Sequence, residues 1–163
     1  MALLKNGRIE TDPYLDVSTE DSIPENGALI ISLTQWQENR DALLNRQEPL
    51  GIVLRSDEKP EAIEDDLGRF KVIALDFPAF GDGRAYSHAR HLRDRYAYQG
   101  ELRAVGDVLL EQLHFMHRVG FNSFNIQCKD AASAWKIATA DISVWYQPTG
   151  DGRTPVMQLR HHE

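Results

Sequence analysis

The 163-residue chain has one cysteine, Cys128, and no apolar run close to the roughly 18–20 residues that cross a membrane. A single thiol excludes an internal disulfide, and also a four-cysteine iron–sulfur cluster or zinc site held by this chain alone. Basic residues are few: 18 Lys and Arg against 25 Asp and Glu give a net charge of −7. Because an acidic surface repels phosphate backbones and anionic lipids, we expect neither a nucleic-acid nor a membrane partner.

Targeting and linker segments are also missing. The first apolar stretch breaks after three residues, which is unlike a signal peptide, so we expect a cytoplasmic protein. Hydrophobic residues make up 42% of the chain, enough for a buried core, and no stretch rich in Pro, Gly or Ser divides it. We therefore expect residues 1–163 to form one domain.

Short apolar runs alternate with segments of helical pattern through residues 28–140. The runs that predict strands are 28–33, 50–54, 71–76, 101–105 and 121–127. The helices expected after them span about 34–44, 60–67, 84–98, 107–119 and 130–140. Such repeated strand–helix units predict an α/β fold with a mostly parallel, five-stranded sheet. The pattern does not distinguish an open sheet from one that curves like part of a barrel.

A short β-hairpin is expected at each end of this core. Residues 3–17 contain Asn6-Gly7, a strong signal for a two-residue turn between antiparallel strands. Residues 142–160 suggest a second hairpin, with strands at 142–147 and 154–159 and a turn through 150–152.

Ligands of parallel sheets gather beyond the carboxyl ends of the strands, where helix N-termini present free amide groups. Two loops fall there, at 76–84 and at 105–107. The segment 83–103 after the first loop holds five arginines and two acidic residues, a net charge of +3 in an acidic protein. Arginine suits bidentate contact with carboxylates, phosphates and sulfur oxyanions, because its donors form a planar, permanently charged fork.

This arginine cluster has two interpretations. In the first it binds an anion or an acidic partner. The expected anion-binding residues are then Arg84, Ser87, Arg90, Arg93, Arg103 and Gly106. Candidate catalytic residues are Asp82, Asp107 and Tyr86, with a carboxylate as general base. In the second interpretation the helix is a solvated one whose arginines pair with surface carboxylates. The charge pattern alone favours the second, and the position beside two strand ends keeps the first open.

Other chemical signals are weaker. His88 with His91, and His114 with His117, are spaced so that each pair could face one metal ion. No second metal motif accompanies them, so we expect surface histidines and no metal site. Cys128 follows a predicted strand, where we expect a buried structural thiol. The chain has no dinucleotide fingerprint and no P-loop, so we expect no bound cofactor.

A long motif, FPAFGDGRAYSHARHLR at residues 77–93, continues into GELRAVGDV at 100–108. It resembles the DUF934 family of bacterial proteins, and the resemblance extends from the Asn6-Gly7 turn to about Gln127. Gly81 departs from the family pattern, in which a basic residue is often found at that position. The residues that match it are Phe80, Asp82, Gly83, Arg84, Tyr86, Ser87, Arg90, Arg93, Gly100, Arg103, Gly106 and Asp107.

Members of this family are commonly labelled as oxidoreductases of sulfite reduction, so the resemblance implies a role in sulfur metabolism. Reduction of sulfite to sulfide needs many electrons, which a cofactor normally supplies. The chain has no motif for siroheme, an iron–sulfur cluster, flavin or nicotinamide. Whether this polypeptide is itself an enzyme is therefore left open.

Three hypotheses follow. The first is an accessory protein of assimilatory sulfite reduction, which binds a small oxyanion, the sulfite reductase or its electron donor through the arginine-rich site. The second is a small enzyme that acts on an anionic substrate. The third is a non-catalytic structural or regulatory α/β module. A sheet of this size with an open edge also favours a homodimer.

Overall fold

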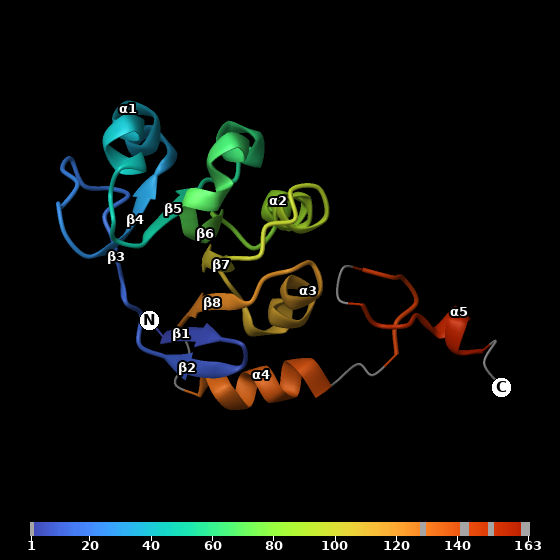
Figure 1. Cartoon of the computed structure of the whole chain (residues 1–163). Helices are drawn as coiled ribbons and strands as arrows, with labels where there is room; N and C mark the ends of the chain where they lie inside the picture. Colours follow the sequence, from blue (N-terminus) through green and yellow to red (C-terminus); the bar gives the residue numbers. More distant parts are fainter. Residues whose placement is uncertain (1, 128–129, 141–143, 150–151, 161–163) are drawn as a thin grey trace.

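The computed structural model describes residues 2–127, 130–140, 144–149 and 152–160. Within these residues, eight strands form one curled sheet (Figure 1). From edge to edge the strands are β2 (Arg8–Glu10), β1 (Ala2–Lys5), β8 (Ser123–Ile126), β7 (Glu101–Gly106), β6 (Phe70–Phe77), β5 (Leu50–Leu54), β4 (Ala28–Ser32) and β3 (Tyr14–Asp16). Strands β3 to β8 are parallel neighbours, whereas β1 is antiparallel to both β8 and β2.

Helices lie along the outer, convex face of the sheet in Figure 1. They are α1 (Leu33–Leu44), the 3-10 helix η1 (Pro60–Arg69), α2 (Arg84–Asp94), the short η2 (Leu110–Gln112) with α3 (Leu113–Arg118), and α4 (Ala131–Ala140). A last helical turn, α5 (Val156–Leu159), belongs to the C-terminal segment. No helix in the described ranges is long and apolar enough to cross a membrane.

Alternation along the strands separates an apolar outer face from an inner face of smaller and polar groups. On β6, Ile73, Leu75 and Phe77 are fully buried in the hydrophobic core beneath the helices. The residues between them, Ala74 and Asp76, point to the other face. The result is a single α/β domain shaped as a half-barrel, with its helices outside.

The two edge strands, β2 and β3, are consecutive in the chain and are joined by residues 11–13 alone. A link of this length spans at most about 14 Å from Glu10 to Tyr14, so the sheet must curl until its edges approach each other. Asp12, in this link, accepts hydrogen bonds of 2.6 and 3.2 Å from the guanidinium of Arg103 on β7. The link is therefore tied to the inner face of the sheet.

A layer of buried charge lies on this inner face. Arg103, which is only 1% exposed, donates from Nε to a carboxylate oxygen of Glu101 at 2.9 Å. Glu101 also accepts from the hydroxyl of Ser123 and pairs with Nζ of Lys5, both at 2.7 Å. Burial alone would raise the pKa of Glu101, but the bonds from Lys5, Ser123 and Arg103 lower it overall. These contacts join β1, β7, β8 and the link.

The sheet of the structure has eight strands, whereas the sequence predicted five. The predicted strands correspond to β4, β5, β6, β7 and β8, and the turn at Asn6-Gly7 is confirmed between β1 and β2. The end of the predicted hairpin instead forms β3, which pairs in parallel with β4, with Tyr14 opposite Ala28. Pairing of this kind joins distant segments, so the local alternation of residues does not reveal it.

The predicted C-terminal hairpin is wrong in its second half, because residues 156–159 form a helical turn. Pro155 immediately precedes this turn; proline lacks the N–H that a strand needs and suits a helix start. Described residues 144–149 contain no strand, and 141–143 and 150–151 lie outside the description. Helix α2 ends at Asp94, before the expected residue 98, and the helix expected from Asp107 begins only at Leu110.

Candidate functional site

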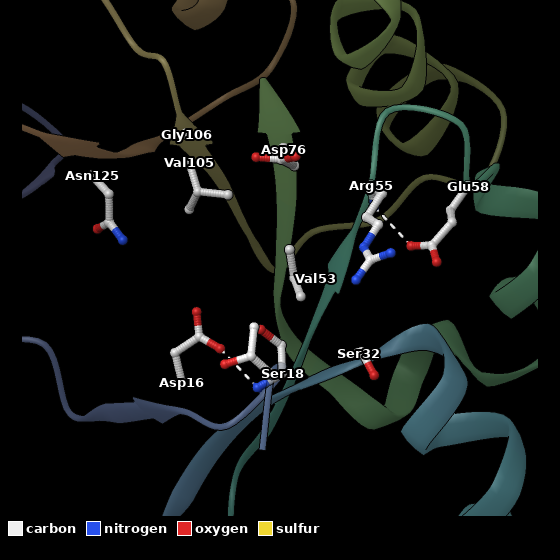
Figure 2. A pocket seen from close by; sticks show the side chains of 11 residues that line it. Asp16, Ser18, Ser32, Val53, Arg55, Glu58, Asp76, Val105, Gly106 and Asn125 are labelled. Atoms are coloured by element: carbon white, nitrogen blue, oxygen red, sulfur yellow. Dashed lines mark hydrogen bonds between the residues drawn. The ribbon is translucent and has the colours of Figure 1, made fainter. Parts of the chain in front are cut away.

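The carboxyl ends of the six parallel strands surround a cavity of about 320 Å³ at one mouth of the half-barrel (Figure 2). Enzymes built from strand–helix units place their ligands at this end of the strands. We call this space the mouth cavity. Each of the six strands contributes a lining residue within one position of its carboxyl end. In the order β3 to β8 these are Asp16, Ser32, Arg55, Asp76, Gly106 and Asn125.

Three of these side chains present polar groups that no other described residue satisfies. The Asp76 carboxyl, the Arg55 guanidinium and the Asn125 amide form no hydrogen bond with the part of the chain that the structure describes. In Figure 2 the side chain of Arg55 extends from the end of β5 toward the Ser32 side of the cavity, and Asp76 lies between it and Asn125 in this view. Native proteins usually pair such groups with protein, water or ligand, so this cavity suits a polar ligand.

Asp76 has the most perturbed carboxyl of the lining. Partial burial raises its pKa, and the nearby carboxylate of Asp82 adds to this effect, whereas the positive charge of Arg55 opposes it. A carboxyl with a raised pKa holds its proton more readily, and can then donate a hydrogen bond as well as accept one. Burial therefore shifts the balance of Asp76 toward its protonated form.

The remaining polar groups of the lining hold the cavity wall. Glu58 accepts a hydrogen bond of 2.7 Å from the backbone N–H of Arg55 and so fixes the loop after β5. Asp16 accepts from the backbone N–H of Ser18 at 3.0 Å. The Ser32 hydroxyl accepts from the N–H of Gln35 at 3.2 Å and caps α1. These contacts hold Glu58, Asp16 and Ser32 in the rim, whereas the guanidinium of Arg55 remains available to a ligand.

Gly106 is placed against Asp76 by its backbone conformation. Its φ of +88° lies in the left-handed region, and a Cβ there would overlap the carbonyl of Phe77 and the carboxylate of Asp76. The next residue, Asp107, donates its N–H to that carbonyl at 2.7 Å and accepts from the N–H of Phe80 at 2.9 Å. The loops after β6 and β7 thus hold each other, and the Asp107 carboxylate takes part in that contact.

The predicted residues at the start of α2 lie beside the mouth cavity but do not line it. Arg84 binds the Asp82 carboxylate at 2.6 Å and the Ser56 hydroxyl at 2.8 Å. The bond from Arg84 lowers the pKa of Asp82, which makes this carboxylate a weak base. Ser87 is exposed, and Tyr86 packs edge-on against Phe77 with a pKa raised by burial.

The other predicted arginines are not brought together with Arg84. Arg90 pairs with Asp94 one helical turn away, at 2.8 Å. Arg93 donates to the carbonyl oxygens of Tyr98, Gly100 and Gly120, and Arg103 lies in the buried layer inside the half-barrel. Of the six predicted anion-binding residues, only Gly106 lines the mouth cavity.

The histidines of the second predicted pair contact different groups. His114 stacks on Trp145, with ring centroids 4.3 Å apart, and Nδ1 of His117 lies 3.2 Å from the carbonyl oxygen of Phe121. Among the described residues, no three His, Cys, Asp or Glu side chains gather in a way that could hold a metal ion. Cys128 lies outside the described residues.

The sequence analysis missed Arg55, Asn125 and Asp16 as site residues. Arg55 follows the predicted strand 50–54 directly, and that position was a usable signal. Asn125 falls inside a predicted strand, and Asp16 inside a predicted hairpin, so neither could be placed at the mouth without knowledge of the curl.

The comparisons with known proteins agree with the motif. The model of a family described as bacterial protein of unknown function (DUF934) matches residues 51–157. Neither the search of curated proteins nor the search of solved structures found a match. The matched range includes β5 to β8, α2 and most of the rim of the mouth cavity. The chain therefore belongs to the DUF934 family.

Proposed function

We propose that the chain is a cytoplasmic accessory protein of assimilatory sulfite reduction, and that it acts by binding a small, singly charged oxyanion in the mouth cavity. The sulfur assignment rests on the motif at residues 77–93 and on the label that members of the family commonly carry. The binding assignment rests on one observation: the side chains of Arg55, Asp76 and Asn125 belong to one cavity and have no hydrogen-bond partner among the described residues.

The donors of the cavity match an oxyanion of single charge. Arg55 supplies a forked cationic donor, the Asn125 amide supplies a neutral one, and Asp76 supplies a hydroxyl donor when it is protonated. Asp16 and Glu58 add negative charge to the same lining, which opposes a dianion. Hydrogen sulfite therefore fits this lining better than sulfate or a phosphate dianion.

Calorimetric titration with sulfite under anaerobic conditions tests the binding. We expect saturable binding to the natural protein and a loss of at least about tenfold in affinity for Arg55→Ala. Arg40→Ala is the matched control, because Arg40 is an exposed arginine that pairs with Asp66 on another part of the surface. Equal affinity in the two variants, or no binding to the natural protein, would contradict the proposed site.

Growth tests the pathway separately. A strain that lacks the gene should fail on sulfate and on sulfite, and should recover on sulfide or cysteine. The natural gene should restore growth, whereas Arg55→Ala should restore it poorly. Normal growth of the deletion strain on all four sulfur sources would remove the sulfite-reduction role without bearing on what the cavity binds.

An acidic protein partner is the second candidate ligand, and exposed arginines of α2 and its end support it. The side chains of Arg84 and Arg95 are 57% and 63% exposed, and each leaves donors available to a partner. Binding to sulfite reductase or its electron donor should weaken in raised salt and in the double variant Arg84→Glu with Arg95→Glu. Arg40→Glu should leave it unchanged, and a salt-independent affinity would contradict this route.

A further inference from the structure

A second hollow lies near the end of α2, among the segments that lead into β7 and β8. Its volume is about 260 Å³, and Arg90, Arg93, Gln99, Arg118 and Gly120 contribute to its lining. The lining holds three guanidinium groups and a single carboxylate, that of Asp94. We call it the arginine hollow. This concentration of positive charge stands out in a protein whose net charge is −7.

Arg93 is built into the wall of the arginine hollow. Its guanidinium donates to the carbonyl oxygens of Tyr98, Gly100 and Gly120, and it lies 5.6 Å from the centre of the Tyr98 ring. Gly120 has a φ of +113°, and a Cβ there would overlap the Arg93 side chain. All these partners are neutral, so they orient the guanidinium without cancelling its charge.

Arg118 and Arg90 complete the positive wall in different ways. Arg118 is about nine-tenths buried; its guanidinium lies 4.0 Å from the centre of the Trp145 ring and donates to the carbonyl oxygen of Gln147. Arg90 is half exposed and uses Nε for Asp94, which leaves its two terminal nitrogens directed to other partners or solvent. Two arginines are thus fixed in place, and one can adjust.

We propose that the arginine hollow binds a tetrahedral oxyanion of the phosphate or sulfate class, either free or as the terminal group of a small metabolite. The terminal nitrogens of Arg90 and the remaining N–H of Arg93 can donate to the oxygens of one such anion, and the positive charge of the lining attracts it. The arginine hollow and the mouth cavity share no lining residue, so this proposal is independent of the proposed function.

Titration of the purified protein with inorganic phosphate, by calorimetry at low ionic strength, tests the proposal. We expect saturable binding that weakens in raised salt. Arg90→Glu should weaken it at least tenfold, because it replaces a positive wall group with a negative one. Gln99→Glu, which leaves every arginine in place, should also weaken it. Arg40→Glu changes the charge as much as Arg90→Glu, but outside the hollow, and should bind as the natural protein does.

Melting curves of all variants show whether they are folded, and Arg55→Ala separates the two sites. The proposal is overturned if the natural protein shows no saturable phosphate binding, if Arg40→Glu weakens binding as much as Arg90→Glu, or if Arg55→Ala removes it. A phosphate monoester such as phosphoserine, titrated in parallel, distinguishes the two sources: tighter binding than phosphate identifies a metabolite, and weaker binding a free anion.

Discussion

Two layers of polar side chains line the inner face of the half-barrel, and they lie only two residues apart along the same strands. In the interior layer, Arg103, Glu101 and Ser123 bond to one another and to neighbouring segments. In the mouth layer, Asn125 on β8 lies two residues beyond Ser123. Asp76 on β6 lies two residues beyond Ala74, which is paired with Arg103 on β7. Asn125 and Asp76 are both without a hydrogen-bond partner among the described residues.

The difference follows from access to water. A buried charge without a partner costs several kcal/mol, so the interior layer can exist only if it is fully paired. The mouth side chains are partly exposed, and water or a ligand can satisfy them. Polar groups in the interior therefore connect segments of the fold to one another, whereas polar groups at the mouth remain available for binding.

The largest expected effect is that of Arg103→Ala on stability. Loss of this guanidinium leaves the Glu101 carboxylate with fewer donors and releases Asp12 from the inner face. We expect the free energy of unfolding, measured in urea, to fall by about 3–5 kcal/mol. Arg55→Ala, the counterpart at the mouth, should change it by less than about 0.5 kcal/mol. Similar losses in the two variants would remove the distinction between the layers.

Gly106→Ala should have the next largest effect. The substitution combines a φ of +88° with overlap against Phe77 and Asp76, and we expect a loss of about 2–3 kcal/mol in urea. Gly27→Ala is the matched control, because Gly27 has a φ of +94° but nothing within 4 Å of an added Cβ. It should cost only about 1 kcal/mol. Equal losses would mean that backbone strain, and not contact with Asp76, decides the need for glycine at 106.

Much of this arrangement follows from local sequence patterns. Runs such as 50–54 and 71–76 are apolar and bounded by helical segments, and each became a strand of the parallel sheet. The two loops at 76–84 and 105–107 do meet, through the contacts of Asp107 with Phe77 and Phe80. The parallel direction of β4 to β8 follows from the strand–helix repeat itself.

The rest depends on contacts between distant residues. Arg103 pairs with Asp12, which is 91 positions away in the chain. In the sequence, Arg103 therefore counts as a member of the local arginine cluster, although in the fold it is buried. The same holds for Arg93, whose partner carbonyl at Gly120 is 27 positions away. A charge count along the chain cannot separate an arginine that binds a ligand from one that fastens two loops.

The contributions of Asp76 and Asp82 to stability should respond to pH in opposite directions. Burial raises the pKa of Asp76 above its ordinary value of 3.8, so its ionised form costs stability at neutral pH, and this cost is lost as the pH falls through the raised pKa toward 3.8. The bond from Arg84 lowers the pKa of Asp82, so its ionised form adds stability above pH 3.8, and this gain is lost on acidification.

Asp76→Asn should therefore raise stability at neutral pH, and Asp82→Asn should reduce it only slightly, because Arg84, the partner of Asp82, is largely exposed. Both differences from the natural protein should shrink toward zero in strong acid, where the natural carboxyls are protonated as well. Urea unfolding across the acid range measures the stabilities, and NMR titration of the two carboxyl carbons measures the pKa values directly. A pKa of Asp76 below that of Asp82 would contradict the assignment of Asp76 as the proton-holding group.

The smallest expected effect is that of Arg84→Ala, although Arg84 makes as many bonds as Arg103. Its guanidinium contacts Asp82 and Ser56, but the side chain is 57% exposed, whereas Arg103 is 1% exposed. Because Arg84 is exposed, water replaces part of its contacts with Asp82, and urea unfolding should show only a small loss of stability. A loss as large as that of Arg103→Ala would mean that bond number, rather than burial, determines what an arginine contributes to this half-barrel.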